Sequence, residues 1–321
     1  MLKFNLFKSK QNKQCIAFYN IENLFDIYKD DLTRDDDFNP TSEKRWTIKR
    51  YNNKLRKIGY AMSNIGRKET NTHPAIIGLA EVENEAVIKD LIASKHLAEY
   101  PYNYVHYDSK DERGIDVALL YDNKKFSVLH SEIFEISFHT DDDIDHTRDI
   151  LWVKGLFLNE ELNFIVNHWP SRRAGNNETE HKRKAAADYV EMIISKIKTD
   201  KPDAKIVIMG DFNDDPASKS VKQLVNNQGL FNPMETLISI DRGTTVHNFE
   251  WNLFDQIIIT HNFFERKAKS LRYVNADIYD ADFLKQYDGK YKGTPYRTYV
   301  GKRYKGGYSD HFPVYMILNK K

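Results

Sequence analysis

The stretch from Ile206 to Pro216 constrains the fold of this chain more than any other. It reads IVIMGDFNDDP, and its apolar first half is typical of a β-strand that is buried on both faces. The strand is expected to end at Gly210, so that Asp211 and Asn213 follow at its carboxyl end, where α/β folds bind ligands. Gly-Asp after a strand is also typical of an ordinary turn. The interpretation therefore depends on the rest of the chain.

Composition indicates a globular protein without a global charge signal. The chain has 321 residues, 40% of them hydrophobic, and a net charge of +1, so any basic surface must be local. The single cysteine, Cys15, excludes an intramolecular disulfide and lies beside an expected strand, which favours a buried thiol. The sequence has neither the apolar core of a signal peptide nor an apolar run long enough to span a membrane. We expect a cytoplasmic protein, although a trimmed leader would leave the same sequence.

Apolar strands alternate with amphipathic helices along the chain. Strands are predicted at 15–18, 75–80, 102–107, 115–121, 126–137, 150–158, 162–167, 206–209, 251–260 and 312–318, and helices at 46–65, after 85 to about 93, 179–197 and 217–226. The acidic segment that follows Asp26 and the basic segment 277–305 are predicted to be irregular. The lysines and arginines of helix 46–65 are expected on its solvated face. No repeat or linker divides the chain, so we expect one domain at 15–321 after a flexible segment at 1–14.

Several other predicted strands also end in polar side chains. Together with Asp211 and Asn213, these strand ends supply Asn20, Glu81, His168, Asp255, Asp310 and His311. Carboxylate and amide oxygens without a Cys-His cluster favour magnesium, manganese or calcium over zinc. A phosphate ester is the substrate that suits such a set, because a bound cation polarises a phosphoryl oxygen and a histidine can move a proton.

Six separated blocks carry a resemblance to a known family. They are FYNIEN at 18–23, IIGLAEVEN at 76–84, NHW at 167–169, GDFND at 210–214, DQIII at 255–259 and SDH at 309–311. In this order the blocks resemble those of the endonuclease/exonuclease/phosphatase family, to which deoxyribonuclease I and exonuclease III belong. The resemblance implies a four-layer α/β sandwich, with two packed β-sheets flanked by helices, and a metal-dependent phosphodiester hydrolase.

The resemblance also implies a role for each matching residue. Asn20 and Glu81 match metal-site positions, with Mg²⁺ the expected ion and Mn²⁺ or Ca²⁺ as alternatives; Glu83 is a less suitable ligand than Glu81. Asp310 matches a residue that binds water or a second metal. Five residues match catalytic positions: Asp211 for the attacking water, Asn213 and His168 for the phosphate, and His311 with its orienting carboxylate Asp255. The general base is open between Asp211 and the pair of His311 with Asp255.

The chain departs from the family pattern at two places without losing a metal ligand. Ala80 stands where the family often has Gln, and Asn167 directly precedes His168 where the family often has an intervening Thr. Arg113 lies where some family nucleases place a tyrosine, and a phosphate contact and a solvated loop are about equally expected for it. Other histidines and acidic residues are expected to be structural or solvated: His73, His106, His181 and the run 141–145.

Three functions remain open, with a nuclease favoured. A nucleic acid backbone would lie along basic residues that flank the site, with bases stacked on Trp169 and Tyr296; these basic residues are Arg172, Arg173, Lys182, Arg183, Lys184 and the basic members of 285–305. The alternative is a phosphatase or phosphodiesterase for a small or lipid-headgroup phosphate, clamped by the same arginines. A non-catalytic phosphate-binding module is the third possibility, and no protein partner is predicted.

Overall fold

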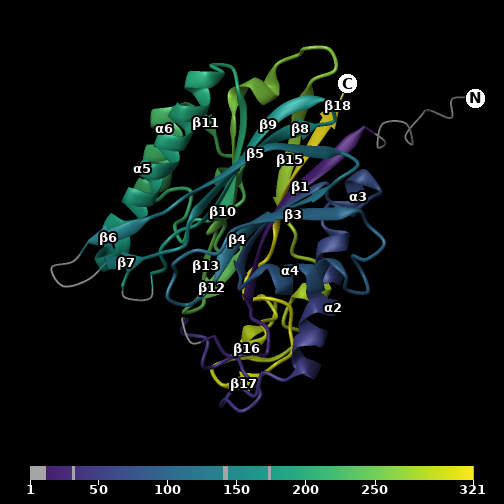
Figure 1. The fold of residues 1–321 in the computed structure, drawn as a ribbon, viewed down its shortest axis with the longest axis vertical. Coiled ribbons are helices and arrows are strands. Elements are labelled where there is room, and N and C mark those ends of the chain that lie inside the picture. The colour runs from purple at the N-terminus through teal and green to yellow at the C-terminus, as the bar shows by residue number, and fades with distance from the viewer. Residues whose placement is uncertain (1–11, 31–32, 140–143, 173–174, 321) are drawn as a thin grey trace, which may run out of the picture.

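Strand β10 (Lys205–Asp211) packs between two hydrophobic cores. Val207 and Met209 belong to the core between the two sheets, whereas Ile206 and Ile208 belong to a second core beneath a helix pair. This alternation follows from the two-residue period of a strand, and it explains why the sequence is apolar without interruption. The arrangement is that of a computed structural model, which describes residues 12–30, 33–139, 144–172 and 175–320 (Figure 1).

Two six-stranded sheets form the centre of the molecule. The first has the order β15-β18-β1-β2-β4-β3, with β15 (Leu271–Ile278), β18 (Val314–Lys320), β1 (Lys13–Leu24), β2 (Ile76–Val82), β4 (Asp116–Asp122) and β3 (Tyr102–His106). The second has the order β11-β14-β10-β9-β8-β5, with β11 (Leu230–Phe231), β14 (Asp255–Thr260), β9 (Glu160–His168), β8 (Ile150–Phe157) and β5 (Phe126–Phe134). In each sheet two central strands are parallel, β1 with β2 and β9 with β10, so that their carboxyl ends lie at the same edge.

Helices cover the outer face of each sheet (Figure 1). The first sheet is covered by α2 (Ile48–Asn64), α3 (Arg67–Thr70) and α4 (Glu85–Ile92), and the second by α5 (Asn176–Asp200) and α6 (Lys219–Gln228). The layers are therefore helix, sheet, sheet and helix, which confirms the predicted four-layer sandwich. Within the described part of the chain, none of the helices combines the length and apolar character that a membrane crossing requires.

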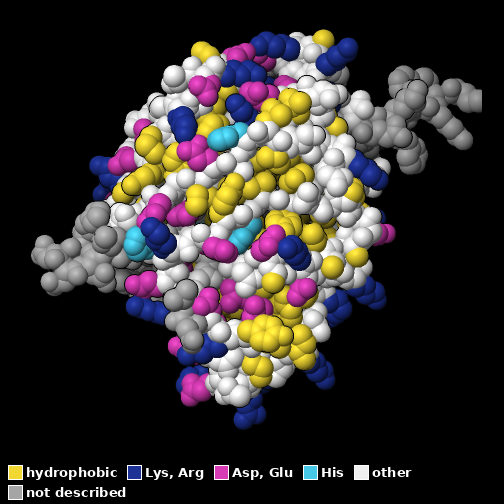
Figure 2. Space-filling view, viewed as in Figure 1, with side chains coloured by type: hydrophobic (Ala, Val, Ile, Leu, Met, Phe, Trp, Pro, Cys, Tyr) yellow, Lys and Arg dark blue, Asp and Glu magenta, His cyan; other side chains and the backbone are white. Residues whose placement is uncertain are grey.

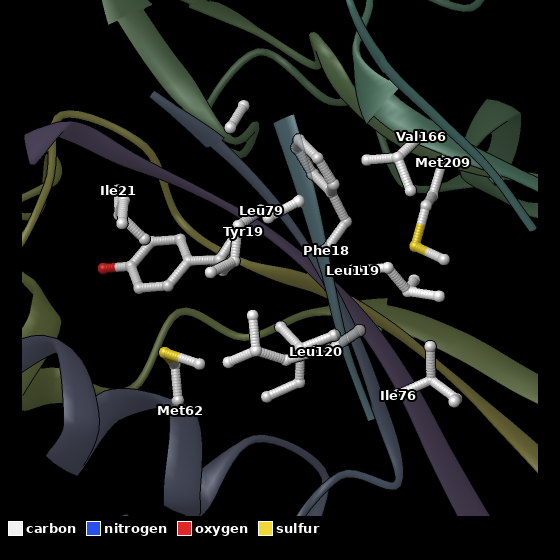
Figure 3. Packing of buried hydrophobic residues seen from close by; sticks show 14 of the residues in the cluster. Phe18, Tyr19, Ile21, Met62, Ile76, Leu79, Leu119, Leu120, Val166 and Met209 are labelled. Atoms are coloured by element: carbon white, nitrogen blue, oxygen red, sulfur yellow. The ribbon is translucent and has the colours of Figure 1, made fainter. Parts of the chain in front are cut away.

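The sheets meet through closely packed side chains (Figure 3). Met209 of β10 packs directly over Gly78 of β2, where a Cβ would lie only 2.7 Å from the Met209 sulfur and 3.0 Å from the ring of Phe18. On the opposite face of the first sheet, Met62 of α2 lies beside Leu120 and Tyr19 (Figure 3). A side chain at position 78 would displace Met209 from this space, so the glycine leaves room for Met209 between the sheets.

Small hairpins and short 3₁₀ helices complete the chain. The hairpins are β6 (Ser137–His139) with β7 (Ile144–His146), β12 (Thr245–His247) with β13 (Glu250–Asn252), and β16 (Tyr299–Val300) with β17 (Arg303–Tyr304). The 3₁₀ helices are η1 (Pro233–Thr236), η2 (His261–Phe264), η3 (Asp282–Leu284) and η4 (Gly289–Tyr291). In Figure 1, β16 and β17 lie at the lower end, toward which β1 runs, and β12 and β13 lie above them, closer to the sheets. These hairpins surround the carboxyl ends of the parallel strands.

Most predicted elements are confirmed, and the exceptions have physical reasons. The expected strand 251–260 is wrong as one element, because Leu253 donates to Asp215 Oδ1 at 2.7 Å and the chain changes partner from β12 to β10. Likewise 126–137 divides into β5 and β6. Strand β15 was not predicted. It lies at a sheet edge and most of its side chains are only half-buried, so its sequence lacks the apolar run of a buried strand. The first strand begins at Lys13, and 1–11 lie outside the described residues, so a flexible N-terminal segment stays a prediction.

The solvated face predicted for α2 is wrong at Lys54. This lysine is buried, and its Nζ donates to Thr298 Oγ1 and to the Tyr308 carbonyl, both at 2.6 Å. It follows Tyr51 by three positions and precedes Ile58 by four, so it belongs to the apolar stripe. That spacing was a sequence signal for its burial. The predicted burial of Cys15 is confirmed, and burial raises the pKa of its thiol well above the usual range.

Candidate active site

Strand register in the second sheet places three of the expected site residues in one row. Asp211 at the end of β10 is the partner of His168 on parallel β9 and of Asp255 on antiparallel β14. All three side chains are buried. Gly210 allows this close approach, since a Cβ there would lie 2.4 Å from the Asn167 carbonyl oxygen. The Gly-Asp pair is therefore a tightly packed strand end.

The first sheet contributes Asn20 and Glu81 from the facing ends of β1 and β2. Glu81 lies at an irregularity in the pairing of β2 with a positive φ of 65°, and its Oε2 accepts a hydrogen bond from the Asn23 amide at 2.8 Å. Asn20 Nδ2 donates to Asp211 Oδ2 at 3.0 Å and lies 3.4 Å from Glu81 Oε1. One amide group thus joins the two sheets at the site.

Asp211 Oδ2 is the atom on which the site converges. It lies 3.8 Å from His168 Nε2 and 3.9 Å from His311 Nε2, while Oδ1 accepts from the Asn213 amide at 2.9 Å. The pKa of Asp211 is raised to about 6, chiefly by burial; the charge of His311 opposes this rise and the neighbouring Asp255 adds to it. A carboxylate with this pKa takes up a proton near neutral pH, as a general base requires.

The two histidines that face Asp211 have opposite charge preferences. Burial, assisted by Arg148 and Arg113, holds the pKa of His168 well below its usual range, so this imidazole is neutral. Burial also opposes the charge of His311, but Asp255 and Asp211 raise its pKa well above the usual range. The Nδ1 atom of His311 lies 2.7 Å from Asp255 Oδ2, which directs Nε2–H toward Asp211.

Glu81 is better placed than Glu83 to hold a cation. Glu81 Oε1 and Asp211 Oδ2 both face His168 Nε2, at 3.9 and 3.8 Å, and share the amide of Asn20. The two carboxylates fit a hard divalent cation. Asn20 presents Nδ2 to both of them and its Oδ1 accepts from the Glu22 amide at 3.0 Å, so metal binding by Asn20 stays a prediction that requires its amide to turn round. Glu83 instead accepts from the Asp26 amide at 2.6 Å and is buried.

Glu83 should make stability depend on pH. Burial raises its pKa from 4.5 to about 8, so the unfolded chain ionises this carboxyl at pH values where the folded protein keeps it protonated. The stability that it contributes below the unfolded pKa is lost as pH rises to about 8. We expect Glu83→Gln to melt about 5 °C above wild type at about pH 8 and close to wild type at about pH 5, in thermal melts followed by circular dichroism. The exposed Glu99→Gln is the control, and a pH-independent effect of Glu83→Gln would contradict the assignment.

Asp310 also faces His311 Nε2 and is hydrogen-bonded to an arginine. Its Oδ2 accepts from Arg297 Nη2 at 2.7 Å, and Oδ1 lies 4.0 Å from His311 Nε2. Burial opposes ionisation, but His311 and Arg297 hold the pKa of Asp310 below its usual range. It therefore adds negative charge beside His311, and a role for it in metal binding stays a prediction.

A buried pair, Glu22 with Lys54, was missed in the sequence. Glu22 Oε2 accepts from the Thr298 amide at 2.6 Å and lies 3.9 Å from Lys54 Nζ. Burial raises the pKa of Glu22 to about 7 and lowers that of Lys54 to about 8. The pair fastens the segment near Thr298, beside Arg297, to β1 and α2. It stabilises the wall of the site that carries Asp310.

The predicted substrate arginines differ in their surroundings. Arg113 Nη2 donates to Asn23 Oδ1 at 2.7 Å and lies 4.0 Å from Glu81, so it borders the site. Arg172 instead braces the loop after β10, with bonds to the Asn213 carbonyl at 2.7 Å and to Asp214 at 2.6 Å. Arg173 lies outside the described residues. Arg148 was not predicted as a residue near the site. It donates hydrogen bonds to Asp111 and to the Trp169 carbonyl, both at 3.1 Å.

Two predicted nucleic acid contacts, those of Trp169 and Arg183, are wrong because both side chains are buried. Trp169 is fully buried, with its Nε1 bonded to Asn167 and its ring packed on Phe212, so it cannot stack a base. Arg183 is also fully buried, and its Nε lies 2.9 Å from Asp214. The side chains of the acidic run 141–145 lie outside the described residues. Acidic and basic side chains alternate over the face shown in Figure 2, in keeping with the net charge of +1.

Fold and site together identify the class to which the chain belongs. The model of the endonuclease/exonuclease/phosphatase family matches residues 15–320, so the chain is a member of that family, as its motifs predicted. No curated protein matches the chain in sequence.

Solved structures share the architecture at low identity. A family member from Bacteroides thetaiotaomicron is 18% identical with a TM-score of 0.59, covering 96% of this chain and 95% of that one. A mannosyl-6-phosphatase from the same organism is 17% identical with a TM-score of 0.58, covering 95% and 99%. TDP2 from D. rerio, complexed with a single-strand DNA product, is 16% identical with a TM-score of 0.55, covering 96% and 99%. At these identities the similarity shows the fold alone.

Proposed function

We propose that the chain is a Mg²⁺-dependent phosphodiester hydrolase of the nuclease type. The observation that supports this most directly is the pair of histidines around Asp211 Oδ2, at 3.8 and 3.9 Å, one neutral and the other charged. Groups whose pKa values are driven apart in one site are typical of acid–base catalysis. A binding module would not need this separation, and none of the six motif blocks is lost from the chain.

The chain's own residues can position a phosphate and move a proton. His311 presents Nε2–H and His168 a neutral imidazole, so a phosphate oxygen between them would be stabilised as its charge develops. Asp211 accepts the proton of the attacking water, and the Asn20 side-chain amide and the Asn213 backbone amide fix its two oxygens. The Asn213 side-chain Nδ2 donates to the Trp169 carbonyl at 2.9 Å, so it would have to leave this bond to hold the phosphate. A divalent cation held by Glu81, with Mn²⁺ or Ca²⁺ as alternatives to Mg²⁺, would neutralise charge on the phosphoryl group; Asn20 would join it as a ligand with its Oδ1 turned toward Glu81.

Cavities on both sides of the site favour a diester over a terminal monoester. One cavity of about 630 Å³ begins at Asn23 and Arg113, next to Glu81. The other, of about 540 Å³, begins at Arg297 and Asp310, next to His311. A phosphate held next to Asp211 and His311 therefore has room for a substituent on each side. A phosphatase for a small phosphate ester would use one of them.

The substrate class is tested by comparing diesters with monoesters. Purified protein is incubated with plasmid DNA, RNA, bis-p-nitrophenyl phosphate and mannose 6-phosphate, with Mg²⁺ or with EDTA. We expect hydrolysis of the nucleic acids and the aryl diester in Mg²⁺ only. If the protein hydrolysed mannose 6-phosphate and none of the diesters, the nuclease proposal would be wrong and a phosphatase would take its place.

Metal dependence should be specific to Glu81. We expect Glu81→Gln to raise the Mg²⁺ concentration for half-maximal activity at least about tenfold, because one carboxylate oxygen of the cation site is lost. The matched control is Glu83→Gln, the same change two residues along the strand end. Equal effects of both substitutions on the Mg²⁺ requirement would contradict the assignment of Glu81.

A further inference from the structure

The cavity beside His311 is bordered by two exposed aromatic rings. Phe249 and Tyr291 stack with their centroids 5.2 Å apart and their planes 2° from parallel. Phe249 is 61% exposed and Tyr291 42% exposed, so neither ring has the burial of a core residue. Both rings line the same cavity as Arg297 and Asp310, which connect it to the site.

The backbone conformation at position 249 does not favour a phenylalanine. Asn248 and Phe249 join β12 to β13 with φ values of 49° and 67°, both in the left-handed region. A two-residue hairpin of this form favours Asn at the first position and Gly at the second. Asn248 follows that preference and Phe249 does not, which leaves a strained residue with an exposed ring. Strain of this kind is common where a side chain contacts a ligand.

Basic side chains lie beside the rings and elsewhere in the same cavity. Lys290 Nζ lies 5.5 Å from the centroid of Phe249 and 4.9 Å from that of Tyr291. Arg303 and Lys305 line the same cavity, along with the acidic Asp288. Exposed rings beside a basic surface are the combination by which proteins hold single-stranded nucleic acid, with bases stacked on rings and phosphates next to cations.

We propose that Phe249 and Tyr291 stack a nucleobase of the strand whose phosphate lies at Asp211. The neighbouring phosphates would lie along Lys290, Arg303 and Lys305. This inference rests on the proposed phosphodiester hydrolase activity. It specifies the substrate as single-stranded nucleic acid, with one base bound in the cavity on the His311 side of the site. Trp169, which is buried, is thereby replaced as the stacking residue.

Binding in the absence of turnover tests this proposal. Asp211→Asn protein is titrated with a fluorescent oligothymidylate and with an abasic deoxyribose-phosphate oligomer of equal length. We expect Phe249→Ala or Tyr291→Ala in that background to weaken oligothymidylate binding about tenfold while leaving the abasic oligomer unchanged. Phe249→Trp should retain the binding of both. Phe264→Ala, an exposed phenylalanine at the opposite end of β14, is the matched control and should change neither.

Phe249→Gly separates a ligand role from a structural one. Glycine suits the positive φ, so we expect its melting temperature to equal or exceed that of the parent while the preference for oligothymidylate is lost. Equal weakening of both oligomers, or no weakening of either, would overturn the proposal. This experiment measures binding and not hydrolysis. If wild type hydrolysed no diester but its preference for oligothymidylate depended on Phe249, the stacking proposal would be supported and only the proposed reaction would be contradicted.

Discussion

Asp211→Asn should lower kcat about a thousandfold on whichever phosphodiester the protein hydrolyses. Asparagine keeps the size of the side chain and can still accept from Asn20 or from the Asn213 amide, but it has no carboxylate to take a proton from water. The loss should appear in kcat more than in KM, since the proton moves in the transition state and not in the bound ground state. Steady-state kinetics at saturating Mg²⁺ measures both.

Asp203→Asn is the matched control for that variant. Asp203 is exposed and precedes the amino end of the same strand, β10. It should have wild-type kinetics. Because burial makes ionised Asp211 unfavourable, Asp211→Asn is also expected to melt no lower than wild type at neutral pH. Full turnover by Asp211→Asn would remove Asp211 from the mechanism, and a fall in melting temperature would indicate that the variant had lost structure instead.

The architecture was predictable because strand ends and their polar residues are local features of the sequence. The apolar run before Gly210 and the run before Glu81 each specify a buried strand with a polar end, and both proved to be central parallel strands. The row of His168, Asp211 and Asp255 was not predictable from these runs, since it depends on the register of one parallel and one antiparallel pairing. Tertiary pairing, and not propensity, aligns the three side chains.

Charged residues caused the largest errors, for a physical reason. Lys54 was assigned to a solvated face and Arg183 to a nucleic acid contact, because charged side chains are seldom fully buried without a partner. Each has its partner far away in the sequence: Glu22 and the Tyr308 carbonyl for Lys54, and Asp214 for Arg183. Such long-range pairs leave only a faint signal in the sequence, such as the position of Lys54 on the apolar stripe of its helix. The sequence did not single out Phe249 either, because its left-handed backbone conformation belongs to a hairpin turn that the adjacent residues do not indicate.

Asp255→Asn should lower kcat about a hundredfold and at the same time change the charge of His311. The Asn side chain can still accept the Nδ1–H bond that Asp255 Oδ2 accepts at 2.7 Å, so the ring stays oriented. The negative charge that most strongly raises the pKa of His311 is lost, however. A histidine whose folded pKa is raised is charged up to that pKa, so lowering it moves the loss of charge to lower pH. We expect the imidazole resonance of His311 in NMR to titrate at lower pH, and the alkaline limb of the rate profile to move the same way.

Asp255→Ala distinguishes orientation from charge, since it removes both. We expect it to be slower than Asp255→Asn at every pH, and the difference between the two variants measures what the oriented ring contributes. Asp241→Asn, in an exposed loop, is the control and should leave the profile unchanged. If Asp255→Asn lowered kcat while His311 kept its titration midpoint, the charge of His311 would not come from Asp255. If the midpoint fell while kcat stayed constant, the imidazolium would have no part in the rate, and Asp211 alone would be the proton-transfer residue.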